Sequence, residues 1–126
     1  MKRVFVCLLL CILTGCRPLA AMIVLPSPEE IVRVTVTDGE GEVFYGDSTY
    51  AAVLIGAMEG ARPTRQASIH DAPTVPGAIR VEFAFKNGGS SRVFVYTEHG
   101  QTWLEQPYQG IYRADAALLA LLEEGT

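Results

Sequence analysis

The alternation of apolar and polar positions between residues 31 and 45 predicts two antiparallel strands. In residues 31–37, apolar side chains recur at every second position, namely Val32, Val34 and Val36. This period of two is typical of a strand with one buried face. The Asp-Gly-Glu-Gly stretch of residues 38–41 predicts a turn, and residues 43–45 then form the returning strand of a hairpin.

A different spacing follows at residues 49–59, where apolar residues recur every three or four positions. The stripe consists of Tyr50, Val53, Leu54, Ala57 and Met58. This spacing places one apolar face along an α-helix. Asp47 or Ser48 can cap the start of the helix through a side-chain oxygen, and Gly60 is placed to end it.

The second half of the chain predicts three more strands and a second helix. Residues 60–78 show no periodicity and contain three prolines, which indicates a long irregular connection. Strands are expected at residues 79–85, 92–97 and 102–105. Glycine-containing turns at 87–89 and 99–100 separate them. Asp115 can cap a last helix, whose broad apolar face contains Leu118, Leu119, Leu121 and Leu122.

The order of these elements, β-β-α-β-β-β-α, predicts one α+β domain over residues 31–126. Its sheet should have about five antiparallel strands, because short hairpin links exclude parallel pairs, which need a long crossover. Two helices that each carry one apolar stripe can both pack on one face of such a sheet.

The first sixteen residues have the pattern of a bacterial lipoprotein signal peptide. Lys2 and Arg3 supply the positive start, and residues 4–13 are uncharged and apolar. A membrane-spanning helix needs about 20 apolar residues, so this run matches the apolar region of a signal peptide. The residues 13–16, Leu-Thr-Gly-Cys, have the form of a lipobox. We therefore predict that residues 1–15 are removed and that the Cys16 thiol is lipidated, with acyl chains such as palmitate.

Two other interpretations of this region stay open. One is an ordinary signal peptide that is cut at the small residues 19–21, and the other is an uncleaved anchor extended by residues 19–25. Arg17 and Pro18 interrupt the longer apolar run, which argues against an anchor. Residues 16–30, which contain three prolines, are then predicted to be a fairly stiff tether.

The charge of the chain restricts its partners. Removal of Lys2 and Arg3 with the signal peptide leaves 8 basic and 14 acidic residues, a net charge of −6. Lys86 is then the only lysine, so the domain lacks the basic patch with which proteins bind nucleic acids or anionic lipids. Cys7 and Cys11 also leave with the signal peptide, so no disulfide can form within the mature chain. The membrane is expected to be reached through the lipid.

Three segments of the chain resemble a known family of small bacterial proteins. They are Leu-Pro-Ser-Pro-Glu-Glu-Ile at 25–31, Pro-Thr-Arg-Gln-Ala-Ser-Ile-His-Asp-Ala-Pro at 63–73, and Glu-Gln-Pro-Tyr-Gln-Gly-Ile-Tyr at 105–112. On these residues the chain resembles domain of unknown function 5301, a family that includes many lipoproteins, over nearly all of residues 25–122. The resemblance implies one compact α+β domain behind a lipobox, and it implies no activity.

Ser68, His70 and Asp71 carry the side chains of a hydrolytic triad. Such a triad needs the hydroxyl, imidazole and carboxylate in line, beside an oxyanion hole. Residues this close in sequence rarely reach that geometry, and the chain has no Gly-x-Ser-x-Gly elbow. Ser68 and Asp71 are instead expected to cap turns of a proline-bounded loop. The sequence therefore favours a protein that is not an enzyme, and the alternative is a small envelope hydrolase that uses Ser68 and His70.

No metal or other cofactor is expected from the sequence. His70 and His99 show neither a His-x-x-x-His spacing nor a nearby pair of cysteines. Residues 38–42 carry acidic side chains at alternate positions but lack the later glutamate of a calcium loop.

The candidate binding surface combines the irregular loop with aromatic side chains near the last helix. Aromatic residues with a polar tip are enriched at recognition surfaces. The candidate residues are Ser68, His70, Asp71, Trp103, Tyr108 and Tyr112. The alternative is that the three rings cover the core where the last helix docks.

These features together predict a lipid-anchored, non-enzymatic module on the outer face of the cytoplasmic membrane. Its partner would be a protein or another envelope component, and not a nucleic acid. A sensory or inhibitory domain that acts on a membrane partner is a further alternative.

Overall fold

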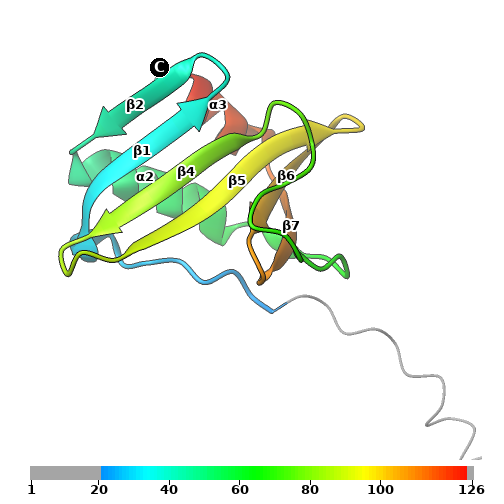
Figure 1. Ribbon diagram of the computed structural model, residues 1–126, viewed down its shortest axis with the longest axis horizontal. Coiled ribbons are helices and arrows are strands. Elements are labelled where there is room, and N and C mark those ends of the chain that lie inside the picture. Colours follow the sequence, from blue (N-terminus) through cyan, green and yellow to red (C-terminus); the bar gives the residue numbers. More distant parts are fainter. Residues whose placement is uncertain (1–20, 125–126) are drawn as a thin grey trace, which may run out of the picture.

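Antiparallel hairpins build a seven-stranded sheet in the computed structural model, which describes residues 21–124 (Figure 1). The strands are β1 (Ile31–Asp38), β2 (Gly41–Tyr45), β3 (Arg62–Pro63), β4 (Ile79–Phe85), β5 (Ser90–Glu98), β6 (Gln101–Gln106) and β7 (Gly110–Ala114). Their order in the sheet is β2-β1-β4-β5-β6-β7-β3. The helices are the short 3-10 helix η1 (Pro28–Glu30), α2 (Ser48–Glu59) and α3 (Ala116–Glu124). The predicted α+β class is confirmed.

Local turn chemistry sets the register of the hairpins. Between β1 and β2, Asp38 Oδ1 accepts the backbone N–H two residues later at 2.7 Å, and Asn87 Oδ1 does the same between β4 and β5 at 2.9 Å. His99 and Gly100 have φ angles of 53° and 74° between β5 and β6. Two residues with positive φ form a turn whose twist suits a two-residue hairpin. The turns predicted at these places are confirmed.

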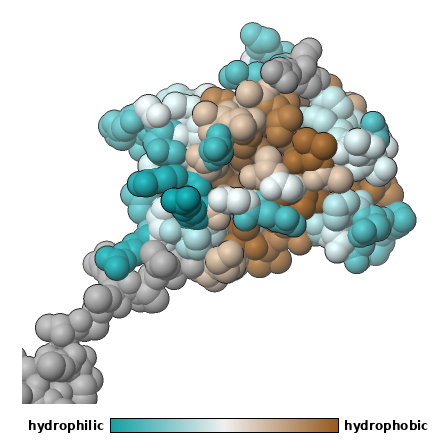
Figure 2. Space-filling view, turned by 180° about the vertical axis from the view of Figure 1, so that it is seen from behind, coloured by the Kyte–Doolittle hydropathy of each residue, from teal (hydrophilic) through white to brown (hydrophobic). Residues whose placement is uncertain are grey.

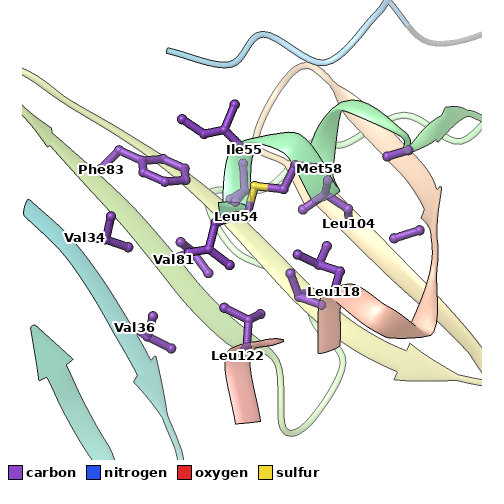
Figure 3. Packing of buried hydrophobic residues seen from close by; sticks show 14 of the residues in the cluster. Val34, Val36, Leu54, Ile55, Met58, Val81, Phe83, Leu104, Leu118 and Leu122 are labelled. Carbon is purple, nitrogen blue, oxygen red and sulfur yellow. The ribbon is translucent and has the colours of Figure 1, made fainter. Parts of the chain in front are cut away.

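Both helices pack on one face of the sheet (Figure 1). Asp47 accepts the N–H of Thr49 at 2.8 Å and so caps α2, and Asp115 accepts the N–H of Ala117 at 2.9 Å and so caps α3. These side-chain oxygens satisfy backbone donors that the first helical turn leaves free. The core between helices and sheet is shown in Figure 3 and includes Val34, Val36, Leu54, Ile55, Met58, Val81, Phe83, Leu104, Leu118 and Leu122.

Two strands beyond the predicted five complete the sheet. The first is β7, in a segment where the sequence predicts no strand, and it pairs with β6 from Gln106↔Gly110 to Thr102↔Ala114. Its inward positions include a glycine and an alanine, so the apolar alternation is too weak to see. The second is β3, which has two residues and ends in Pro63 at the edge of the sheet. Proline lacks the N–H of a ladder, so a short edge strand is where it is tolerated.

The structure also corrects which residues face the core. In β1 the register shifts between Ile31 and Arg33, so Ile31 is buried and Val32 is exposed. Such a bulge moves side chains to the other face, which a strict period of two does not predict. In α2 the buried residues are Ala51, Leu54, Ile55 and Met58. The predicted stripe is therefore rotated, and Val53 is 47% exposed.

The face of the sheet away from the helices is partly covered by the long connection of residues 64–78. This connection runs in front of β5, β6 and β7 in Figure 1, on the side opposite α2 and α3. On this face of β5, Phe94 and Tyr96 are both buried. The connection is therefore a packed cover over a second, smaller buried region.

The helical side of the molecule presents an apolar surface (Figure 2). The exposed positions of α2 include Ala52 and Val53, and those of α3 include Ala117 and Ala120. Within residues 21–124, no helix is long and apolar enough to cross a bilayer.

Candidate functional site

A glutamine side chain holds the N-terminal segment against the end of the sheet. Gln106 Oε1 accepts the N–H of Val24 at 2.8 Å, and Gln106 Nε2 donates to the carbonyl oxygen of Val24 at 2.6 Å. The side-chain amide thus hydrogen-bonds to both the N–H and the carbonyl oxygen of Val24, as the backbone of a neighbouring strand would. Gln106 is itself buried at the end of β6. Val24 is therefore part of the folded domain.

Two further side chains extend this contact toward residue 21. Gln109 Nε2 donates to the carbonyl oxygen of Met22 at 3.2 Å, and the Tyr112 hydroxyl donates to that of Ala21. We call Gln106, Gln109 and Tyr112 the N-terminal clip. All three lie in the stretch 105–112, which carries the most specific part of the family resemblance.

The N-terminal clip docks part of the predicted tether, residues 16–30, on the domain. From residue 21 onward this segment contacts the domain, and Ile23 and Leu25 pack against the core. Cys16, the lipobox and the predicted signal peptide lie outside the described residues. Hydrophobic periodicity does not predict this docking, because residues 21–27 form no helix or strand.

The loop of residues 64–78 begins as an extension of the sheet edge. Thr64 Oγ1 donates to the carbonyl oxygen of Ile111 at 2.6 Å, and the N–H of Ile111 donates to that of Gln66 at 3.3 Å. These bonds continue the pairing of β3 with β7. The chain then continues two residues beyond Gln66 to Ser68, which is buried.

A buried carboxyl group lies beneath this loop. Glu105, on β6, is 6% exposed. Its Oε2 accepts the hydroxyl of Ser68 at 3.1 Å, and its Oε1 accepts the hydroxyl of Tyr96 at 3.2 Å. Burying a carboxyl group is unfavourable unless hydrogen bonds replace those of water, and these two hydroxyls supply them. Burial, together with the nearby Glu105, raises the pKa of Tyr96 above its ordinary value of 10.0.

Tyr108 links the same loop to the turn between β6 and β7. Its N–H donates to Ser68 Oγ at 3.3 Å, and its hydroxyl donates to Asp71 Oδ1 at 2.7 Å. The Asp71 contact raises the pKa of Tyr108. The backbone of Tyr108 also has a φ of 60°, a conformation that residues other than glycine rarely adopt. Its hydrogen bonds to the loop offset the strain of this conformation.

Two pockets border the loop. One has a volume of about 520 Å³, and its lining includes Arg65, Ser68, His70, Tyr96, Glu98 and Glu105. The other has a volume of about 580 Å³, and its lining includes Val24, Asp71, Arg92, Gln106, Pro107 and Gln109. The first pocket contains the hydrogen-bonded carboxyl group, and the second adjoins the N-terminal clip.

The structure brings together only some of the candidate residues from the sequence. Ser68, Asp71 and Tyr108 are joined by hydrogen bonds, and His70 is exposed at the first pocket. The three rings lie apart: Tyr108 is exposed, whereas Tyr112 belongs to the core beneath the helices.

Trp103 lies on the face of the sheet opposite the helices, not at the docking place of the last helix. It pairs in register with Tyr96, and its Nε1 donates to the carbonyl oxygen of Glu98 at 3.3 Å. The Arg113 guanidinium lies 5.7 Å from the ring centroid, within the range of a cation–π contact.

Three important residues have no signal in the sequence that distinguishes them. Glu105 and Tyr96 alternate with core residues, so the pattern predicts them on a solvated face. Glu105 and Tyr96 are buried because the loop of residues 64–78 covers this face of the sheet. Gln106 lies in the stretch with the strongest family resemblance, but its contact is with a residue 82 positions earlier.

The geometry around Ser68 differs from that of a hydrolytic triad. The Ser68 hydroxyl donates to Glu105 rather than to an imidazole. In the part of the chain that the structure describes, His70 makes no hydrogen bond or ion pair, and no group of three His, Cys, Asp or Glu side chains could hold a metal ion. The Ser68 contact satisfies a buried carboxyl group, which is a structural and electrostatic role.

Two tyrosines with raised pKa values, the partly buried Tyr50 and the buried Tyr96, predict a loss of stability at high pH. Burial raises the pKa of Tyr50 to about 12, and the pKa of Tyr96 is also raised. As the pH rises above the ordinary value of 10.0, the unfolded chain loses protons that the folded protein retains. The free energy of unfolding should therefore fall as the pH rises further. Urea unfolding midpoints from about pH 9 to about pH 12 measure this, and Tyr96→Phe should make the decline shallower. An equally steep decline in that variant would contradict the assignment to Tyr96.

Comparison with known proteins agrees with this fold. A family model for DUF5301, described as a domain of unknown function (DUF5300), matches residues 19–113. A solved structure, described as the NMR structure of a protein from Ruminococcus gnavus, has a TM-score of 0.64 and 26% sequence identity. The match covers 74% of this chain and 91% of that chain. No curated protein matches the chain significantly. Neither match indicates an enzymatic family.

Proposed function

We propose that this chain, which belongs to the DUF5301 family, a domain of unknown function, is a lipid-anchored, non-enzymatic binding module. The module would act on the outer face of the cytoplasmic membrane. Its ligand site would be the first pocket, beneath the loop of residues 64–78.

The Glu105 carboxyl group is the observation that carries the binding role. It lines the pocket while it is held by two hydroxyl donors, so its position is fixed before any ligand arrives. A preorganised polar group of this kind lowers the entropic cost of binding. Glu98 also lines the pocket, and Arg65 is the one arginine among its lining residues. The chemistry favours a ligand that donates hydrogen bonds from a cationic group, such as a primary amine on an envelope component.

The anchor is supported by the sequence of the first sixteen residues. Cys16 follows small residues at the end of an apolar run, and it is the only cysteine of the mature chain. The wild-type chain should incorporate labelled palmitate, and a Cys16→Ser variant should not. If the wild type incorporates no more palmitate than this variant does, the lipid anchor is ruled out.

The binding role can be tested with cadaverine, a diamine, as the probe. Trp103 is the only tryptophan and lies beside Tyr96 in the sheet, so its fluorescence can report binding. We expect a saturable change with cadaverine that 1-pentanol, a neutral alcohol, does not produce.

Two variants make this titration specific. Glu105→Gln keeps the shape and removes the charge, so it should weaken cadaverine binding at least about tenfold. His70→Ala changes an exposed residue at the same pocket and should bind cadaverine as the wild type does. Equal affinity in wild type and Glu105→Gln would refute this site. Turnover that the wild type shows and His70→Ala loses, with folding intact, would instead favour the hydrolase interpretation, which needs the imidazole.

Ser68→Ala is not a suitable test of catalysis. Because the Ser68 hydroxyl donates to a buried carboxyl group, its removal also changes the stability of the fold. His70→Ala separates the two effects, since His70 is exposed.

A further inference from the structure

Exposed apolar side chains gather at one corner of the domain. Among residues 21–124, seven large apolar side chains are exposed, and four of them belong to this corner. They are Met22 at 63%, Val24 at 61%, Ile69 at 68% and Tyr108 at 67% exposed. We call these four residues the apolar corner.

Hydrogen bonds and one shared pocket place the segments that carry the apolar corner at the same end of the sheet. Met22 and Val24 are held by Gln109 and Gln106, and Tyr108 lies between these two glutamines in the chain. Ile69 follows Ser68, whose hydroxyl oxygen accepts the N–H of Tyr108. In Figure 1 the segment from residue 21 runs along the end of the sheet where β6 and β7 are joined. The corner is therefore carried by segments that hydrogen bonds tie to the end of the sheet.

The N-terminal clip also limits how far this corner can lie from the proposed anchor. Only residues 17–20 stand between Cys16 and Ala21, whose carbonyl oxygen is bonded to Tyr112. The Cα atoms of residues 16 and 21 are separated by at most about 18 Å even in a fully extended chain. The headgroup layer of a bilayer leaflet is itself about 5–8 Å thick. A lipidated Cys16 thus keeps the apolar corner near the membrane surface.

We propose that the apolar corner contacts the lipid bilayer in which Cys16 is anchored. This inference rests on the proposed lipid anchor. Met22, Val24 and Ile69 would enter the boundary between headgroups and acyl chains, and Tyr108 would place its ring there, as tyrosines do at membrane interfaces.

Asp71 and Arg92 line the adjoining pocket with one charge of each sign, which suits a zwitterionic headgroup layer. The turns at residues 39–40 and 99–100 would then point away from the membrane, because they lie at the opposite end of the sheet.

A single-cysteine labelling experiment on the lipidated protein tests this orientation. Cys7 and Cys11 leave with the signal peptide and the Cys16 sulfur is alkylated, so the wild-type lipoprotein should take no thiol label. An Ile69→Cys variant carries a fluorophore at the apolar corner, far in sequence from the anchor, and Glu40→Cys carries it at the opposite end. Both variants are reconstituted in phosphatidylcholine vesicles that contain a lipid with a nitroxide quencher.

We expect the label at residue 69 to be quenched at least about threefold more than the label at residue 40, because quenching requires contact with lipid. Adding Met22→Ser and Tyr108→Ser to the Ile69→Cys variant should reduce that quenching. If both labels are quenched equally, or neither is quenched in protein that remains on the vesicles, the apolar corner does not face the bilayer and the anchor still stands. If the wild-type chain takes the thiol label, Cys16 is not lipidated, and the anchor and this orientation both fail.

Discussion

Replacing Ser68 with alanine and Tyr96 with phenylalanine together should lower the free energy of unfolding by about 2–6 kcal/mol at neutral pH. Each change removes one hydroxyl that donates to Glu105, and together they leave a carboxyl group that is 6% exposed without either donor. A buried acceptor that loses its partners bears the full penalty of its lost hydration. Urea unfolding followed by circular dichroism measures the difference.

A third substitution separates this cause from general damage to the fold. Glu105→Leu in the double variant removes the polar group itself, so it should recover much of the lost stability while leaving the pocket without its carboxyl group. Tyr108→Phe is the matched control, since it removes a hydroxyl bond to the exposed Asp71 and should change stability far less. A triple variant as unstable as the double variant would show that the carboxyl group is not the reason for the loss.

Gln106→Ala should release the N-terminal segment from the domain. The substitution removes both hydrogen bonds to Val24, of 2.8 Å and 2.6 Å, and should cost about 1–3 kcal/mol because Gln106 is buried. Amide hydrogen exchange at Val24 should become at least about tenfold faster, since its N–H then opens without global unfolding.

Gln109→Ala provides the control for this prediction. It removes a single bond of 3.2 Å from a less buried residue, so exchange at Val24 should change little. Gln106→Ala should also make residues 21–25 sensitive to limited proteolysis, because a released segment can enter a protease. Unchanged exchange at Val24 in Gln106→Ala would mean that core packing of Ile23 and Leu25 holds the segment without the clip.

The two experiments concern the contacts of two neighbouring residues of β6. Glu105 and Gln106 are adjacent in β6, so they point to opposite faces of the sheet. One side chain fixes the loop over the proposed pocket, and the other fixes the segment that leads to the proposed anchor. The family resemblance in residues 105–112 thus corresponds to contacts that hold irregular parts of the chain in place.

Much of the secondary structure follows from the sequence alone because its causes are local. Asp47 and Asp115 cap their helices through backbone groups two residues away, and the turn at His99 and Gly100 depends on their own φ angles. The α+β class and the antiparallel sheet follow in turn from short links between strands. The signal peptide and lipobox are also sequence patterns, and they stay predictions.

The tertiary structure alone decided which irregular segments are docked and which polar residues are buried. Ser68 donates to Glu105, 37 positions later in the sequence, and Gln106 bonds to Val24, 82 positions earlier. Hydrophobic periodicity is local, so it does not predict contacts between residues so far apart in sequence. The strand β7 is likewise hidden, since Gly110 and Ala114 are too small to mark a buried face and only the ladder with β6 defines it. Periodicity records which face of an element is apolar, whereas burial of a polar group depends on what another part of the chain places above it.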